Sequence, residues 1–208
     1  MKLTWLGHAC FCLESGGYRV LLDPYGRVEG YPEPQATVHA VYCSHGHQDH
    51  CNRDAAVLLS ERENPFTVTE LKSFHDDQCG ALRGENTIRV FEAEGLRVAH
   101  LGDLGHMPDA ALCGALCALD VLLVPVGGFY TIDAQQAAAL VRQLQPRVAV
   151  PMHYRHAPYG LPNVGGVEPF LAEFGAVHVV RLDGSSFTVG EQSAGCIVVP
   201  AYCGSELQ

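Results

Sequence analysis

Short apolar runs alternate with turn-forming residues in the first part of the chain. A serine and two glycines at residues 15–17 predict a hairpin turn. Glycine and proline interrupt residues 25–37, which predicts a loop without regular structure. The apolar and β-branched runs before and after these turns predict strands at residues 2–6, 10–14, 18–22 and 38–43.

The rest of the chain changes repeatedly between strand and helix patterns. Residues 134–144 place Ala138, Val141 and Leu144 on one apolar stripe, which predicts an amphipathic helix. Residues 121–126 are almost wholly apolar, so we expect a central strand covered on both faces. Further strands are predicted at residues 66–71, 86–94, 96–101, 148–151, 177–182, 186–189 and 197–199, and further helices at residues 53–60, 108–117 and 167–174. This order of elements predicts an α/β protein.

The composition is that of one globular domain covering residues 1–208. The chain is 48% hydrophobic and 17% charged, which is typical of a folded protein with a sizeable core. The formal net charge of −10 disfavours nucleic acid or an anionic membrane surface as a partner. A small anionic substrate remains possible, because bound metal ions could supply local positive charge.

Nine cysteines are present, with no C-x-x-C pair, and most of them lie in apolar runs. This pattern predicts reduced thiols in a cytoplasmic protein. A secretion signal is not expected, because His8 and Glu14 interrupt the apolar residues near the start of the chain. The longest apolar stretch, residues 110–119, is shorter than a membrane span, so we expect no membrane partner.

The densest chemistry lies in the sequence HGHQDH at residues 45–50, directly after a predicted strand. Imidazole and carboxylate groups are preferred ligands of divalent metals. Because residues two apart in an extended segment point the same way, His45 and His47 can bind one ion. Asp49 and His50 follow where the chain turns, and they can reach a second ion. A solvated histidine-rich loop is the alternative, but this order of residues after a strand favours metal binding.

The order of ligands in residues 45–50 resembles the metallo-β-lactamase superfamily of metal-dependent hydrolases. Other segments that carry the resemblance are residues 5–8, 22–24, 74–76, 100–106, 125–131 and 151–155. Within the superfamily the chain is most similar to the branch that includes ascorbate-6-phosphate lactonase and related small hydrolases. The resemblance implies an α/β fold, a four-layer αββα sandwich in which two mixed sheets face each other and the metals lie at one edge.

The resemblance also implies the remaining metal ligands. His75, the first histidine after the cluster, would complete the site begun by the first two histidines. Asp103 lies in a glycine-rich turn where the family places a carboxylate that bridges two ions, and His153 would complete the second site. The predicted ligands are His45, His47, Asp49, His50, His75, Asp103 and His153. The predicted cofactors are two divalent ions, with Zn2+ favoured and Mn2+ or Fe2+ compatible with the same ligands.

Other polar residues near these segments have less specific signals. His8 and Asp23 each end a predicted strand, and related sequences place a similar pair near the metals. Each of the two is either a group that orients a ligand or an ordinary structural residue. Asp76 or Asp77 could orient the ring of His75.

Three residues are the predicted catalytic groups, namely Asp49, His106 and Tyr130. Asp49 is placed to hold one ion and to orient the nucleophile. His106, Tyr130 or Arg155 could stabilise the developing anion, although such residues in rim loops are usually ordinary surface groups. Cys51 could add a thiolate ligand, but the metal motif is complete without it.

The resulting hypothesis is a metal-dependent hydrolase of a small lactone, ester or phosphoester. Two ions would lower the pKa of a shared water, so that hydroxide is available near neutral pH. One alternative is a nuclease or phosphodiesterase of the same fold, which the acidic balance disfavours. Another is a non-catalytic metal-binding scaffold, which the intact ligand set disfavours. We expect a small-molecule substrate selected by residues 25–37, 129–131 and 156–166, and the exposed loops are compatible with a homo-oligomer.

Overall fold

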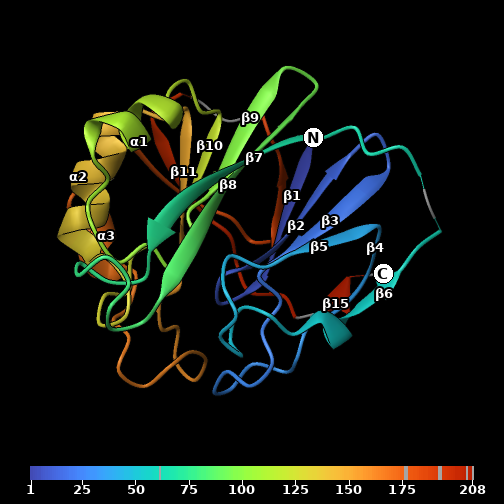
Figure 1. The fold of residues 1–208 in the computed structure, drawn as a ribbon, viewed down its shortest axis with the longest axis horizontal. Helices are drawn as coiled ribbons and strands as arrows, with labels where there is room; N and C mark the ends of the chain where they lie inside the picture. Colours follow the sequence, from blue (N-terminus) through green and yellow to red (C-terminus); the bar gives the residue numbers. More distant parts are fainter. Residues whose placement is uncertain (61, 176–177, 192–193, 205, 208) are drawn as a thin grey trace.

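Two mixed β-sheets lie face to face in the structure, a computed structural model that describes residues 1–60, 62–175, 178–191, 194–204 and 206–207 (Figure 1). The first sheet contains β1 (Lys2–Gly7), β2 (Cys10–Ser15), β3 (Tyr18–Leu22), β5 (Ala40–Tyr42) and β13 (Ser186–Thr188). Its strand order is β13-β1-β2-β3-β5. The hairpin turn predicted between β2 and β3 is present, and the two strands pair from Ser15 opposite Tyr18 to Phe11 opposite Leu22.

The second sheet has seven strands in the order β12-β14-β11-β10-β9-β8-β7. These strands are β7 (Thr67–Phe74), β8 (Glu85–Ala93), β9 (Leu96–His100), β10 (Val121–Pro125), β11 (Val148–Met152), β12 (Val179–Arg181) and β14 (Cys196–Val199). All five residues of β10 are buried, as its apolar sequence predicts. The predicted beginning of the β12 strand at residue 177 lies outside the described residues.

The core lies between the two sheets. Leu3 and Phe11 of the first sheet and Val90 and Leu122 of the second are at most 1% exposed and belong to one apolar cluster. The helices α1 (Ala110–Ala115), α2 (Ala134–Leu144) and α3 (Glu168–Ala172) cover the outer face of the seven-stranded sheet, on the left of Figure 1. Helix α2 has the predicted bounds and begins with a capping box between Asp133 and Gln136.

The outer face of the first sheet differs from the prediction. The helix predicted at residues 53–60 is wrong, because a single 3-10 turn (Arg53–Ala55) leads directly into strand β6 (Ala56–Leu58). The strand predicted at residues 38–43 is also interrupted at His39, so that β4 (Gln35–Val38) pairs with β6 instead of joining the first sheet. Together with β15 (Glu206–Leu207), these strands form a small third sheet on this side.

An apolar contact explains why this small sheet forms. Leu6 and Leu21 point out of the first sheet and need cover, and Tyr25, Val28 and Val38 pack on them in a second buried cluster. Val38 belongs to β4, so β4 lies in this covering layer and not in the first sheet. The backbone groups of β4 still need hydrogen-bond partners, and they pair with β6 and β15. The outer layer on this side of the αββα sandwich is therefore a 3-10 turn and a short sheet.

Strand direction brings distant parts of the chain to one edge. β3 and β5 are parallel, and β1 runs the same way because both β1 and β3 are antiparallel to β2. In the second sheet β9, β10 and β11 are parallel, and β7 shares their direction because both β7 and β9 are antiparallel to β8. The segments that follow these carboxyl ends contain all the predicted ligands.

In the part of the chain that the structure describes, none of the helices has the length and apolar character needed to cross a bilayer.

Candidate metal centre

Three polar residues that follow strands adopt left-handed backbone conformations. The φ angles are 51° at His8 after β1, 44° at Asp23 after β3, and 51° at His153 after β11. Residues other than glycine rarely adopt this conformation, and each instance costs on the order of 1 kcal/mol or more. All three side chains are buried. Such strain at buried polar residues is typical of functional sites.

The structure brings the first three predicted histidine ligands together. One ring nitrogen from each of His45, His47 and His75 lies within 4.8 Å of the others. The first two come from the loop after β5, and the third directly follows β7. We call these three residues the first group. Three imidazole nitrogens in one place leave a tetrahedral metal ion with one open position.

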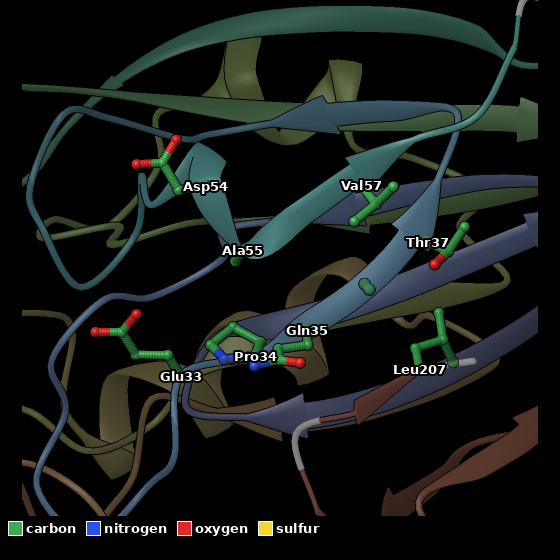
Figure 2. A pocket seen from close by; sticks show the side chains of 9 residues that line it. Glu33, Pro34, Gln35, Thr37, Asp54, Ala55, Val57 and Leu207 are labelled. Carbon is green, nitrogen blue, oxygen red and sulfur yellow. The ribbon is translucent and has the colours of Figure 1, made fainter.

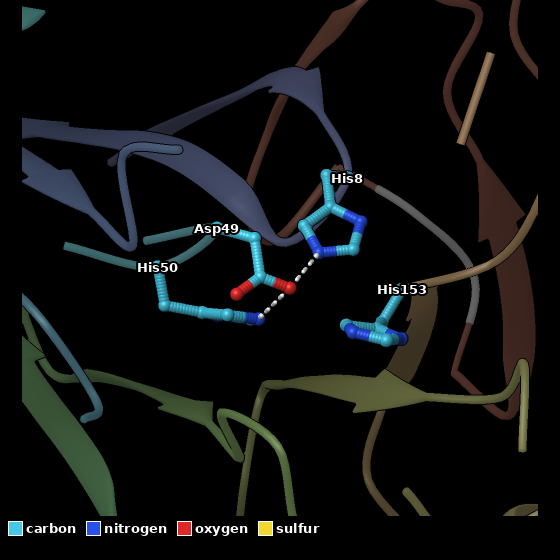
Figure 3. A group of neighbouring side chains, drawn as sticks. All are labelled: His8, Asp49, His50 and His153. Atoms are coloured by element: carbon cyan, nitrogen blue, oxygen red, sulfur yellow. Dashed lines mark ion pairs between the residues drawn. The ribbon is translucent and has the colours of Figure 1, made fainter. Parts of the chain in front are cut away.

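A second group consists of His8, Asp49, His50 and His153 (Figure 3). The Oδ2 atom of Asp49 lies 3.5 Å from Nε2 of His8 and 3.7 Å from Nε2 of His50. The rings of His8 and His153 approach to 4.2 Å between centroids. His8 is therefore a member of the group and not only a neighbour of it, which the sequence did not settle.

Asp103 lies between the two groups. Its Oδ2 atom is 3.2 Å from Nε2 of His75 in the first group and 3.3 Å from Nε2 of His153 in the second. Its Oδ1 atom is 3.1 Å from Nε2 of His50, and its Oδ2 atom is 4.0 Å from Nε2 of His45. The side chain is 2% exposed. A carboxylate in this position can contact an ion in either group.

The donor atoms fit divalent metal ions. Nε2 of His8, His45, His50 and His153 and Oδ1 of Asp103 are buried and have no hydrogen-bond partner. Leaving so many buried polar atoms unpaired is costly, and native proteins avoid it unless a ligand satisfies them. Nitrogen and carboxylate oxygen atoms that converge in this way are the donors that zinc and related ions prefer.

Asp23 determines which ring nitrogen of two histidines is free. It accepts hydrogen bonds from the Ser44 backbone N–H at 2.6 Å and from the Ser44 hydroxyl at 2.5 Å. Nδ1 of His50 lies 2.8 Å from the same carboxylate, so this nitrogen carries the proton. Because the Ser44 hydroxyl donates to Asp23, it accepts from Nδ1 of His45 at 2.9 Å. Both histidines therefore direct Nε2 toward the centre, where this nitrogen can bind a metal ion in its unprotonated form.

Asn86 fixes the backbone of the central carboxylate, a role that no sequence motif indicates. Its Oδ1 atom accepts from the Asp103 N–H at 3.0 Å, and its amide donates to the Leu101 carbonyl at 2.9 Å. The nearby Gly102 has a φ of 56°, and a Cβ there would lie 2.3 Å from Oδ1 of Asn86. Only glycine fits at this position without displacing the amide.

Burial and charge set the protonation of the centre. Burial, with a contribution from His153, lowers the pKa of His8 to about 4, and burial with His50 lowers the pKa of His45 to about 4. Burial opposes ionisation of Asp103, but His153 and His50 outweigh it and hold its pKa well below the ordinary value. Neutral imidazoles and an ionised carboxylate are the forms that bind metal ions.

The structure corrects the role expected for Asp76. Its carboxylate accepts hydrogen bonds from the backbone N–H groups of Gln78, Gly80, Leu82 and Arg83 at 2.8 to 3.0 Å. The Nδ1 atom of His75 has no hydrogen-bond partner. Asp76 therefore orders the loop after His75 and does not orient the ring. The adjacent Asp77 is exposed.

The other predicted residues lie in different places. Nε2 of His106 accepts from the Phe74 N–H at 3.3 Å, so the ring supports the end of β7 outside both groups. Tyr130 lines a pocket of about 360 Å3 beside the centre. Arg155 is exposed and does not line this pocket. Cys51 belongs to neither group.

The pocket beside the centre is also lined by two arginines that no sequence motif indicates. Its walls include His47, Asp49, Asp103, Arg27, Arg83 and Tyr130. A different pocket, of about 420 Å3, lies at the small third sheet and is lined by Glu33, Asp54 and residues of β4 and β6 (Figure 2). It contains none of the predicted metal ligands, so the pocket beside the histidines is the candidate active site.

Known proteins are similar to this chain in sequence and in fold. Residues 2–153 match the family described as the beta-lactamase superfamily domain. A UPF0173 protein of Pyrococcus furiosus is 34% identical over 180 residues, which are 74% of this chain and 83% of that protein. A UPF0173 metal-dependent hydrolase of Archaeoglobus fulgidus is 30% identical over 197 residues, covering 76% and 85% of the two chains.

A solved structure is similar over the whole chain. It is that of a Thermotoga maritima protein described as a Zn-dependent hydrolase of the metallo-β-lactamase superfamily. The two are 34% identical with a TM-score of 0.76, and the match covers 100% of this chain and 99% of the other.

Proposed function

The chain belongs to the metallo-β-lactamase superfamily and is a metal-dependent hydrolase, and from this premise we propose that it uses two divalent ions to hydrolyse a small lactone, ester or phosphoester. The first group, His45, His47 and His75, would hold one ion. The second group, His8, Asp49, His50 and His153, would hold the other.

The position of Asp103 carries the proposal. Its carboxylate lies within 3.3 Å of histidine nitrogens from both groups. A single carboxylate can bridge two ions about 3.5–4 Å apart, as in other dinuclear hydrolases. A mononuclear site would not need this residue to lie between two separate sets of donors.

The chemistry follows from this arrangement. Divalent ions held here would act as Lewis acids and would lower the pKa of the attacking water. Burial opposes ionisation of Asp49, but His8 and His50 lower its pKa, so it is a carboxylate at neutral pH. Asp49 also lines the pocket, where it can accept a hydrogen bond from the water and orient it toward the substrate.

Zinc is the proposed metal, because the six imidazoles and two carboxylates of the two groups and Asp103 form a nitrogen-rich donor set. The Thermotoga relative is described as Zn-dependent, which supports the choice. Mn2+ and Fe2+ fit the same donors. All nine cysteines are free thiols, which supports a reducing compartment such as the cytoplasm.

The size of the pocket favours a small-molecule substrate over a nucleic acid. Its volume of about 360 Å3 lies in the range of small-ligand sites. A nuclease would need an extended basic surface that reaches beyond the pocket, which the net charge of −10 disfavours.

Metal content per chain, measured by elemental analysis on untagged protein, tests the proposal together with a hydrolase panel. We expect close to two ions per chain and turnover of at least one lactone, ester or phosphoester. One ion per chain with full activity would contradict the dinuclear mechanism. Two ions without turnover of any compound in the panel would favour the scaffold alternative.

A further inference from the structure

We propose that Arg27 and Arg83 bind an anionic group of the substrate, so that the substrate class is a small molecule carrying a phosphate or a carboxylate away from the bond that is cleaved. Both residues line the same pocket as Asp49 and Asp103. This inference rests on the proposed hydrolytic function, because it concerns what the same site recognises.

Arg27 is held next to the metal-binding loop. The backbone N–H of the preceding Gly26 donates to the carbonyl of Gln48 at 2.8 Å. A Cβ at Gly26 would lie 3.2 Å from Cγ of Gln48, so the two loops are in close contact. On the other side of Gly26, the hydroxyl of the buried Tyr25 donates to the Leu6 carbonyl at 2.8 Å. The backbone that carries Arg27 is therefore fixed relative to residues 45–50.

Arg83 is held by the loop that follows His75. Its own backbone N–H is one of the four that donate to the Asp76 carboxylate, at 2.8 Å. The Gly84 carbonyl accepts from the His75 N–H at 3.0 Å, which connects this loop to the first group. The guanidinium group lies 5.7 Å from the centroid of the Tyr130 ring. This contact limits the directions that the side chain can take.

Within the described part of this acidic chain, both guanidinium groups lack an acidic partner. Of the arginines elsewhere, Arg89 pairs with Glu70 at 2.9 Å and Arg181 with Glu168 at 2.8 Å. Among the residues that the structure describes, neither Arg27 nor Arg83 has a carboxylate oxygen within 4.0 Å of its guanidinium nitrogens. The chain has 23 acidic and 13 basic residues, so acidic partners are abundant. Two arginines that line one pocket are therefore available to a ligand.

The acidic residues of the pocket do not occupy these arginines. The Asp49 carboxylate faces His8 and His50, and the Asp103 carboxylate faces histidines of both groups. Guanidinium groups stay charged at any physiological pH and form paired, charge-assisted hydrogen bonds with phosphate or carboxylate. In a pocket of about 360 Å3, an anionic group bound by these arginines lies close to the metal centre. The anionic group and the bond that is cleaved can therefore belong to the same small molecule.

Matched pairs of substrates test the inference. One pair is δ-gluconolactone and its 6-phosphate, and the other is phenyl acetate and monophenyl succinate. The variants are Arg27→Gln, Arg83→Gln and the double variant. The control is Arg142→Gln, which removes the same charge from helix α2, where Arg142 pairs with Glu173. Metal content is measured for every protein, so that a change in occupancy is not mistaken for a change in recognition.

We expect each pocket variant to lower kcat/KM for an anionic substrate by about tenfold or more, and the double variant by more than either. The neutral partner should change by less than about twofold, and the control should change neither. Loss on the phosphate pair only, or on the carboxylate pair only, would identify which anion is recognised. Equal losses on neutral and anionic substrates, or no loss at all, would overturn the inference.

Binding of inorganic phosphate separates this inference from the proposed function. Calorimetry on the metal-loaded protein should give affinity at least about tenfold weaker for the double variant than for the wild type and the Arg142→Gln control. If no substrate is hydrolysed but this difference is found, the proposed function fails while the anion site stands. If phosphate does not bind, or binds equally to all the proteins, the anion site is refuted whatever the activity.

Discussion

At the scale of single residues, two aspartates organise the centre in different ways. Asp103 contributes its own oxygens and contacts both groups, whereas Asp23 acts through hydrogen bonds to His50 and Ser44. Both are buried, and both are ionised because histidines and hydrogen bonds outweigh the effect of burial. Replacing each should therefore produce different losses.

Replacing Asp103 by Ala should empty at least one metal site and abolish hydrolysis while the chain stays folded. Loss of an outer hydrogen-bond partner of a metal ligand costs about 10- to 100-fold in activity, so loss of a bridging ligand should cost more. Elemental analysis, turnover and circular dichroism are the measurements. The exposed Asp77→Ala is the matched control. An Asp103→Ala protein that keeps two ions would show that the bridging assignment is wrong.

Replacing Asp23 by Asn should weaken metal binding without removing a ligand. The amide can no longer accept hydrogen bonds at both oxygens, so the tautomers of His45 and His50 are no longer fixed. We expect affinity lower by about 10- to 100-fold, measured by competition with a chromophoric chelator. Because Asp23 is connected to a histidine of each group, both ions should be affected. Unchanged affinity at both sites would rule out this orienting role.

Replacing Tyr130 by Phe distinguishes its ring from its hydroxyl. The ring contacts the Arg83 guanidinium, and phenylalanine keeps this cation–π contact. We expect kcat/KM on an anionic substrate to change by less than about twofold for Tyr130→Phe and to fall severalfold for Tyr130→Ala. A large loss of kcat in Tyr130→Phe would instead support the catalytic hydroxyl predicted from the sequence.

At the scale of elements, the functional segments are the loops at the carboxyl ends of strands, and their order depends on buried polar contacts. The loop after β7 is an example. It has no regular structure from Asp76 to Gly84, yet one carboxylate binds four of its backbone N–H groups. The position of Arg83 in the pocket therefore depends on Asp76.

The contribution of Asp76 should depend on pH. Burial acts to raise its pKa, but the backbone donors of Arg83, Gln78, Gly80 and Leu82 lower it from 3.8 to about 2. A lowered pKa in the folded state means that the stabilisation is complete above pH about 4 and is lost as the pH falls toward about 2. Asp76→Asn should therefore be less stable than the wild type at pH 7, and the difference should shrink at pH 3. Denaturant midpoints at pH 7, 4 and 3 measure it, and a difference independent of pH would contradict this account.

The helix predicted at residues 53–60 shows where local patterns fail. Val57 and Leu58 are 68% and 64% exposed, so no buried apolar face stabilises a helix there. The backbone of this segment pairs instead with β4. Helix 134–144 was predicted correctly, because its apolar stripe and its capping residues lie within the helix itself and agree with each other.

At the scale of the whole molecule, two sheets bring ligands from residues 8 to 153 to one edge. His8 follows the first strand of the first sheet, and His153 follows β11 in the second, yet their rings are 4.2 Å apart. Bound ions would hold the two sheets together at this edge. Metal binding and global stability should therefore be coupled.

Removing the ions with a chelator should lower Tm. An ion present at 100 to 1,000 times its Kd stabilises the folded state by about 2.7 to 4.1 kcal/mol, which corresponds to several degrees for a chain of this size. Calorimetric scans with and without chelator measure the shift, and the Asp103→Ala variant should show a smaller one. An unchanged Tm in the wild type would mean that these residues do not bind metal tightly in the folded state.

Local patterns in the sequence predict the candidate metal ligands and most of the elements. The spacing of His45, His47, Asp49 and His50 indicates a metal site because neighbours along one loop have a fixed geometry. The same local logic predicts the strands and helix α2. The metallo-β-lactamase fold and the hydrolase class, which the sequence predicted by resemblance, are confirmed by the comparisons.

Only the tertiary structure decided which distant residues meet. Three arrangements depend on strand pairing and sheet packing: Asp103 between the two groups, Asp23 behind two histidines, and Arg27 and Arg83 in one pocket. Contacts between residues far apart in sequence are not encoded by the pattern around either one. The physical reason is that backbone hydrogen bonds and apolar burial over the whole chain fix the sheets, and the sheets then fix which side chains share the edge.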